Sequence, residues 1–150
     1  MSDIQDLYRE LIIDHGRHPR HFGENSDASH HQKGVNPLCG DQLEVFLELD
    51  NDRIVSASFT GVGCAISIAS ASMMSGLLQG KTIKEADACF TAFHDLVTQG
   101  GEPSASVDCL GKLQVLAGVS EYPTRIKCAT LAWHTMRAAL HEESQPVSTE

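Results

Sequence analysis

The sequence predicts an α+β domain in which a small antiparallel sheet of about three strands packs against about five helices. Two neighbouring segments, 42–49 and 54–60, alternate apolar and polar residues with the period of two that half-buried strands show. Apolar residues recur at helical spacing in segment 2–14 and in several segments after the strands. An isolated hairpin is marginally stable in water, so these strands need helices to pack against.

The first helix is predicted over residues 2–14. Its apolar residues lie on one face: Ile4, Leu7, Tyr8, Leu11 and Ile12. Gly16 and Pro19 are expected to end it. The polar segment that follows is predicted to be a loop with at most one short edge strand, at 28–35.

The two central strands are predicted to form a hairpin. Four apolar side chains of the first strand lie on one face: Leu43, Val45, Leu47 and Leu49. Phe46 interrupts the opposite, polar face, which predicts that this face is partly covered. The turn is predicted at 50–52, because Asp and Asn favour turns.

Four further helices are predicted in the second half of the chain. They run from Cys64 to Gly80, from Thr82 to Thr98, over 106–117, and from Pro123 to His141. The first of them is expected to bury one face: Ile66, Ala69, Met73 and Leu77. Thr82 and Glu85 have the spacing of a capping box. A break in helical structure is predicted at 99–104.

Composition is that of an ordinary globular protein of 150 residues, 41% hydrophobic and 21% charged. We predict one domain over residues 1–141, followed by a disordered tail over 142–150. The formal net charge of −9 argues against nucleic-acid binding, which needs clustered Lys and Arg. No apolar run approaches a membrane span, and the N-terminus lacks the pattern of a signal peptide. We therefore expect a cytoplasmic protein with no membrane or nucleic-acid partner.

The chain has five cysteines, an odd number that poorly matches a disulfide framework in a cytoplasmic protein. Metal or persulfide chemistry is the expected use of some of them. Cys89 and Cys109 lie in apolar helical segments and are expected to be core residues. His15, His18 and His21 lie in and after the end of the first helix, where we expect solvated or structural roles.

Cys39 and Asp41 are separated only by Gly40, and their residue types suit a metal-binding turn. In an extended strand the two side chains would start about 6.6 Å apart. Zinc ligands lie at roughly 2.0–2.3 Å from the metal, so their donor atoms must converge within about 4 Å. The backbone must therefore bend between Cys39 and Asp41, and Gly40 allows this bend.

Two more cysteines lie near predicted helix starts. Cys64 follows Gly63 at a helix N-terminus, where the helix dipole favours a thiolate. Cys128 lies near Arg125 and Lys127, and nearby cations also favour a thiolate. Three thiols and one carboxylate can supply a tetrahedral zinc site. The alternative is that each cysteine is a small buried apolar residue, which is a common role for cysteine.

Three cysteine motifs and the opening segment 7–20 resemble a known family. The motifs are Asn36-Pro37-Leu38-Cys39-Gly40-Asp41, Gly61-Val62-Gly63-Cys64-Ala65-Ile66-Ser67 and Arg125-Ile126-Lys127-Cys128-Ala129-Thr130-Leu131. In this order and spacing they resemble the SufU branch of the IscU-like iron–sulfur cluster assembly proteins. The resemblance extends from residue 7 to about residue 140.

Two features separate the SufU branch from the iron–sulfur scaffolds of this family. Scaffolds have His directly before the last cysteine of the motifs, whereas this chain has Lys127. The SufU branch has an insertion before the last helix, and 100–117 matches it. Scaffolds also have a chaperone-binding Leu-Pro-Pro-Val-Lys segment, where this chain has Glu121-Tyr122-Pro123-Thr124-Arg125. All of these features favour sulfur transfer over cluster scaffolding.

The resemblance implies one zinc ion bound by Cys39, Asp41, Cys64 and Cys128. It also implies an enzyme, a sulfurtransferase, in which Cys39 accepts persulfide sulfur from a pyridoxal-phosphate cysteine desulfurase of the SufS type. A downstream iron–sulfur scaffold would then be a second partner. We expect Cys39 to leave the metal during the reaction, with Gly40 as the hinge, while Cys64 and Cys128 stay fixed on helices.

Arg125 is a candidate for assisting catalysis or docking the partner, and a plain surface role is the alternative. Two alternative functions also stay open at this point. The same cysteines could hold an iron–sulfur cluster in a scaffold protein. Zinc could also serve only to fold a non-enzymatic activator of the desulfurase.

Overall fold

The computed structural model describes residues 3–99 and 105–148 and confirms the α+β fold class. Its sheet has four strands in the order β3-β2-β1-β4. The strands are β1 (His30–Asn36), β2 (Asp41–Asp50), β3 (Arg53–Val62) and β4 (Val147–Ser148). β2 and β3 occur where alternation predicted them, with slightly wider bounds. β1 confirms the strand expected at 28–35, shifted to 30–36, but it is not an edge strand, because β4 pairs with its other side.

The sheet is mixed rather than purely antiparallel. β1 pairs with β2 and β2 with β3 in antiparallel fashion, whereas β4 pairs in parallel with β1 through Gly34 and Val35. We expected disorder over 142–150, but residues 147 and 148 form β4. The turn before β4 is held by Gln32, whose Nε2–H donates to the carbonyl oxygen of Glu143 at 2.5 Å. Residues 149–150 lie outside the described part of the chain.

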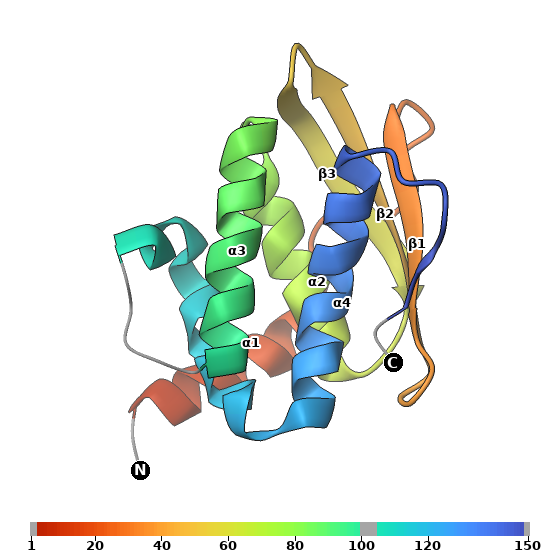
Figure 1. Ribbon diagram of the computed structural model, residues 1–150. Coiled ribbons are helices and arrows are strands. Elements are labelled where there is room, and N and C mark those ends of the chain that lie inside the picture. The colour runs from red at the N-terminus through yellow and green to blue at the C-terminus, as the bar shows by residue number, and fades with distance from the viewer. Residues whose placement is uncertain (1–2, 100–104, 149–150) are drawn as a thin grey trace.

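The helices cover one face of the sheet in two layers (Figure 1). The helices are α1 (Asp3–Arg17), α2 (Ala65–Leu78), α3 (Ile83–Gln99) and α4 (Pro123–Leu140), with a 3-10 helix η1 (Ala105–Glu121). α2 and α4 pack directly on the strands, and α3 lies beyond them. The core between the layers includes Trp133 and Phe93, whose stacked rings lie 4.6 Å apart.

α4 approaches β1 closely because β1 has a glycine at the crossing point. A Cβ on Gly34 would lie 2.0 Å from Thr135 Oγ1, so no side chain fits there. This contact positions the N-terminal turns of α4, which include Cys128, beside the end of the β1–β2 hairpin.

α2 is buried on nearly all sides, although only one buried face was predicted. The expected inward residues Ile66 and Leu77 are only half-buried, whereas the residues between them include a long buried run from Ser67 to Ser75. Periodicity did not reveal this because serine and alanine lie where apolar residues would mark a face. Small side chains let α2 pack between α1, α4 and β3.

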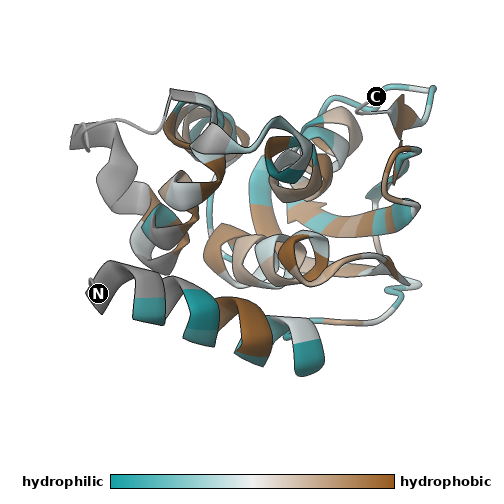
Figure 2. Cartoon of the chain, turned by 90° about the horizontal axis from the view of Figure 1, so that it is seen from below, coloured by the Kyte–Doolittle hydropathy of each residue, from teal (hydrophilic) through white to brown (hydrophobic). Residues whose placement is uncertain are grey.

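α1 lies across the outer side of α2 and runs to Arg17, so the prediction that Gly16 ends it is wrong. Figure 2 shows it from below, with a hydrophobic band between hydrophilic turns. A hydrogen bond of 2.7 Å joins His15 Nδ1 to Ser72 Oγ and ties α1 to α2. A Cβ on Gly16 would lie 3.3 Å from Ala65 Cβ, so this turn packs closely on α2.

The capping box at the start of α3 is confirmed. The N–H of Thr82 donates to Glu85 Oε1 at 2.9 Å, and the N–H of Glu85 donates to Thr82 Oγ1 at 3.1 Å. Cys89 is buried, as predicted. The side chain of Cys109 and residues 100–104, where a break was predicted, lie outside the described part.

The short helix predicted at 106–117 is longer and tighter than expected. η1 consists of 3-10 turns with a kink at Gly111 and continues past Gly118. Its predicted inward residues Leu110, Leu113 and Leu116 are buried. Across the described ranges, no helix has both the length and the apolar character needed to cross a membrane.

Candidate metal centre

Three of the four predicted metal ligands converge at one end of the sheet. A ligand atom from each of Cys39, Asp41 and Cys128 lies within 4.8 Å of the other two. The Cys39 and Cys128 sulfurs are 3.5 Å apart. These residues come from the β1–β2 turn, the start of β2 and the first turns of α4. Residues that are 89 positions apart in the chain therefore meet at one point.

Cys39 is the exposed member of this group and lies on a tight turn. The N–H groups of Cys39 and Gly40 both donate to the carbonyl oxygen of Asn36, at 3.2 and 2.9 Å. Gly40 has a φ of 73°, in the left-handed region that glycine adopts without a Cβ penalty. The bend predicted from ligand spacing is thus present.

Asp41 is fully buried and is held by the start of α2. Its Oδ1 accepts a hydrogen bond from the Cys64 N–H at 2.9 Å, and its Oδ2 accepts one from Ser67 Oγ at 2.8 Å. Gly63 allows this contact, because a Cβ there would lie 2.8 Å from Asp41 Oδ1. Asp41 is thus anchored to the helix, although it lies only two residues from Cys39.

Cys64 caps the N-terminus of α2, as predicted from the glycines before it. Its sulfur accepts a hydrogen bond from the Ser67 N–H at 3.5 Å. The residue is exposed and lies outside the group of three convergent ligand atoms. Asp41 still links it to the group through the Cys64 backbone N–H.

The thiols of Cys64 and Cys128 have opposite pKa shifts. A hydrogen bond from Cys128 is the main cause that lowers the pKa of Cys64 to about 6, and the Ser67 N–H lowers it further. The pKa of Cys128 is raised well above its usual range, first by that same hydrogen bond and then by burial. We expected Arg125 and Lys127 to favour a Cys128 thiolate, and this expectation is wrong because the hydrogen bond to Cys64 and then burial both raise the pKa of Cys128.

Comparisons with known proteins show which family the chain belongs to. Residues 7–141 match the family model of the NifU-like N-terminal domain. The chain belongs to this family. It is 41% identical over 142 residues to the zinc-dependent sulfurtransferase SufU of Bacillus subtilis (strain 168), covering 95% of each chain. It is 39% identical over 140 residues to the iron–sulfur cluster assembly scaffold protein IscU of Streptococcus pyogenes serotype M1, covering 93% of this chain and 86% of that one.

Among solved structures, a candidate iron–sulfur cluster assembly scaffold protein for the SUF system from Fervidobacterium islandicum AW-1 is similar in fold. The TM-score is 0.82 at 33% identity, over 91% of this chain and 98% of that chain. These matches confirm the recognition, from three cysteine motifs, of a SufU-type member of the IscU-like family.

The convergent residues of this NifU-like domain fit a divalent metal ion. Asp41 is 0% exposed, and no ion pair joins it to a basic side chain within residues 3–99 and 105–148. A buried carboxylate without a cationic partner is costly unless it binds a metal. Its two oxygens have lone pairs beyond the two hydrogen bonds that they accept. Thiolate sulfur and carboxylate oxygen are both ligands that zinc accepts.

Sequence reasoning did not single out Ser67, which contacts three of the predicted ligands. Besides its bonds to Asp41 and Cys64, its Oγ lies 3.1 Å from the carbonyl oxygen of Cys128. Ser67 is fully buried. The signal available was its place three residues after Cys64, where an N–H faces the helix cap.

Arg125 lies three residues before Cys128 and is exposed. Its guanidinium lies 4.4 Å from the centroid of the Tyr122 ring, which is also exposed. This cation–π contact holds Arg125 at the start of α4.

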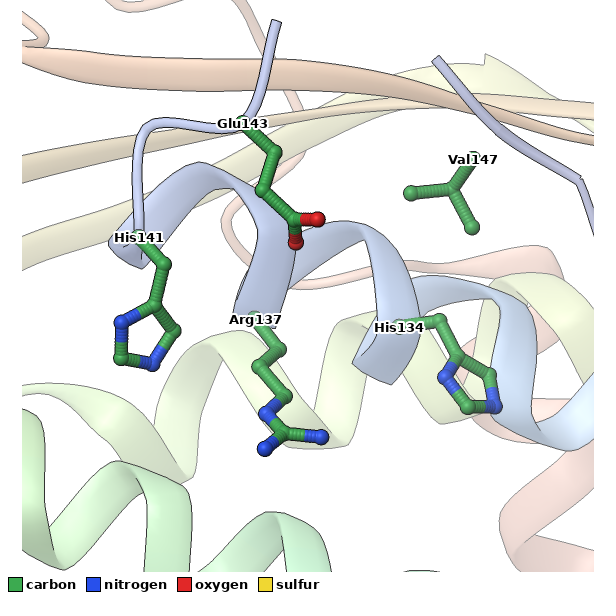
Figure 3. A pocket seen from close by; sticks show the side chains of 5 residues that line it. All are labelled: His134, Arg137, His141, Glu143 and Val147. Carbon is green, nitrogen blue, oxygen red and sulfur yellow. The ribbon is translucent and has the colours of Figure 1, made fainter. Parts of the chain in front are cut away.

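A separate hollow with a volume of about 520 Å³ lies near the C-terminal end of α4. It is lined by His134, Arg137, His141, Glu143 and Val147 (Figure 3). Burial lowers the pKa of His134, and the charges of His94 and Arg137 lower it further. The described residues that line this hollow include none of the candidate ligands.

Proposed function

We propose that this protein acts in iron–sulfur cluster assembly as a zinc-dependent sulfurtransferase. It accepts persulfide sulfur from a pyridoxal-phosphate cysteine desulfurase and passes it to a downstream iron–sulfur scaffold. Membership of the NifU-like family and the similarity to a zinc-dependent sulfurtransferase over 95% of the chain support this proposal.

The observation that supports transfer through Cys39 is the contrast in exposure within the centre. Cys39 is exposed on a turn, while Cys128, whose sulfur is 3.5 Å away, is buried. A sulfur acceptor must be reached by a partner protein, and only access together with thiolate character makes a thiol reactive. Among the three convergent residues, Cys39 alone meets the access requirement.

Zinc would be held by Cys39, Asp41 and Cys128, with Cys64 as the fourth ligand. Cys64 is one hydrogen bond away from Asp41 and Cys128. Bound zinc favours the thiolate form of its cysteine ligands.

In the transfer step, the Cys39 thiolate attacks the terminal sulfur of the persulfide on the desulfurase. The sulfur–sulfur bond of that persulfide breaks, and the cysteine of the desulfurase leaves as a thiolate. Cys39 then carries the persulfide, and no net oxidation occurs. Gly40 allows the turn to move without moving Asp41, which is held by α2.

Exposed side chains around the cysteines can dock the desulfurase. Leu38 and Val62 are both about two-thirds exposed, and each lies within two residues of a cysteine of the centre. Tyr122 and Arg125 lie on the α4 side of the same end. A central apolar patch with an Arg and a Tyr is the composition that protein interfaces favour.

The test is to incubate the zinc-loaded protein with its desulfurase and free cysteine, and to locate persulfide by mass spectrometry. We expect persulfide on Cys39 and acceleration of the desulfurase, and we expect Cys39→Ala to lose both. Cys89→Ala is the matched control, because it removes a buried cysteine of α3 and should keep both activities. Retention of both activities by Cys39→Ala would refute the acceptor role.

The second candidate function is a cluster scaffold, which is favoured by the 39% identity to a relative named as a scaffold. Metal analysis of protein purified without added metal separates the two functions. About one zinc per chain supports the transferase, since structural and catalytic zinc sites hold a single ion. A stable brown cluster that moves to an apo target supports the scaffold. Acceleration of the desulfurase without sulfur on this chain supports a non-enzymatic activator.

A further inference from the structure

Asn36 lies between the exposed turn that carries Cys39 and the buried sulfur of Cys128. It is the last residue of β1 and pairs with Asp41 across the β1–β2 hairpin. It is 0% exposed, which is unusual for an asparagine.

The main chain of Asn36 holds the Cys39 turn. Its carbonyl oxygen accepts hydrogen bonds from both the Cys39 and the Gly40 N–H groups. These two bonds set the backbone on which the Cys39 sulfur is carried, so the placement of this sulfur depends on where Asn36 lies.

The side chain of Asn36 reaches the buried half. Its Nδ2–H donates to the sulfur of Cys128 at 3.7 Å. Its Oδ1 is buried without a hydrogen-bond partner among the described residues. Buried polar atoms are rarely left unpaired. The side-chain amide of Asn36 is oriented so that its N–H donates to the sulfur while Oδ1 has no donor among the described residues, and this orientation calls for an explanation.

We propose that Asn36 is a positioning residue of the metal centre, which ties the Cys39 turn to the Cys128 sulfur through its carbonyl and its side-chain amide. A metal-bound thiolate can only accept hydrogen bonds, and an amide N–H is the matching donor. Such outer partners orient ligands and tune the electron density on them. The inference rests on the metal site of the proposed function.

The test compares Asn36→Leu with the wild type in the full chain loaded with Co²⁺ in place of zinc. Leucine has a similar volume, lacks the N–H donor and leaves the main-chain carbonyl in place. We expect Co²⁺ affinity in a chelator competition to fall about tenfold or more, the range seen when outer partners of metal ligands are lost. We also expect the sulfur-to-cobalt charge-transfer band to move to longer wavelength, because the sulfur loses an electron-withdrawing donor.

Gln32→Leu is the matched control. Gln32 is also a buried amide of β1, but it donates to the carbonyl oxygen of Glu143, away from the cysteines. We expect this variant to bind Co²⁺ with wild-type affinity and an unshifted band. Asn36→Ala replaces Asn36→Leu if leucine prevents folding.

The outcomes separate this inference from the proposed function. A wild type that binds neither Co²⁺ nor zinc overturns the metal site itself. A wild type that binds metal, with an Asn36 variant of equal affinity and band position, overturns only the role of Asn36. Lower affinity with an unshifted band also overturns it, because that result indicates a merely structural effect.

A second measurement needs no variant. In the ¹¹³Cd-loaded wild type, a hydrogen bond from Asn36 to the Cys128 sulfur transmits a scalar coupling between the side-chain amide proton and cadmium. We expect that coupling in a proton-detected NMR spectrum. Its absence from an otherwise assigned spectrum would refute the contact.

Discussion

Cys39 and Asp41 are two residues apart, yet their surroundings are opposite. Cys39 is exposed on a turn held by two backbone hydrogen bonds, whereas Asp41 is 0% exposed and held by α2. Gly40 lies between them with a positive φ and nothing within 4 Å of the place of a Cβ. One motif therefore contributes an accessible thiol and an anchored carboxylate.

This difference in exposure suits two separate roles, metal retention by the buried ligands and reaction at the exposed one. A site that only stores metal gains by burying every ligand, since closed zinc sites are structural. A site that transfers sulfur needs one ligand that a partner can reach. In the proposed transfer, Asp41, Cys128 and Ser67 would keep the site assembled while Cys39 reacts.

The largest expected effect is the loss of metal in Asp41→Ala. This change removes a proposed ligand and leaves the Cys64 N–H without its acceptor, while the Ser67 hydroxyl keeps only the carbonyl oxygen of Cys128. We expect zinc affinity in a chelator competition to fall about 100-fold or more, because losing a ligand should cost at least as much as the largest effects of losing an outer partner. We also expect a cost of about 1–3 kcal/mol in unfolding free energy for the unpaired N–H group. Unchanged zinc affinity would remove Asp41 from the ligand set.

The contrast in exposure predicts an order of thiol reactivity in chelator-treated protein. Iodoacetamide should modify Cys39 and Cys64 before Cys128 and Cys89, as followed by peptide mass mapping. Because the pKa of Cys64 is about 6, its thiolate fraction at pH 7 is about 30-fold that of an ordinary thiol. Its rate should therefore fall only as pH drops through about 6, and a midpoint near 8.5 would contradict this.

Two glycine variants test the anchored and exposed halves separately. In Gly63→Ala the new Cβ meets Asp41 Oδ1 at 2.8 Å, so the carboxylate must shift. We expect zinc affinity to fall about tenfold, as for other changes that misplace a ligand. In Gly40→Ala the Cβ meets nothing, but the positive φ costs about 1 kcal/mol of turn stability. Equal zinc affinities for the two variants would argue against an anchored Asp41.

The smallest expected effect concerns the opposite end of α4 and serves as a control for the centre. The lowered pKa of His134 means that the unfolded chain binds a proton more readily than the folded one. His134 therefore contributes to the free energy of unfolding above its pKa in the unfolded chain, about 6.5. This contribution is lost as pH falls through the lower pKa of His134 in the folded protein. His134→Gln should reduce the loss of urea stability between pH 7.5 and 5.5, with zinc affinity unchanged. If His134→Gln loses as much stability over this pH range as the wild type, the acid sensitivity comes from other groups.

The local elements could be predicted because their causes are local. Alternation predicted β2 and β3, and the Thr82–Glu85 spacing predicted the cap of α3. Glycines before Cys64 predicted a thiol at the start of α2. The burial of α2 on nearly all sides could not be predicted, because serine and alanine fill positions that face three neighbours.

The sequence by itself determined the fold class, the family and the residues that could bind metal, because strand alternation, helix caps and three cysteine motifs are all readable along the chain. Only the tertiary structure decided which donors converge, because Cys39 and Cys128 meet only when α4 packs on Gly34 of β1. It also decided that Asp41 is anchored and Cys39 accessible. The exposure of a side chain depends on which other parts of the folded chain cover it. The local sequence around Gly40 therefore does not determine that Cys39 is exposed and Asp41 is buried.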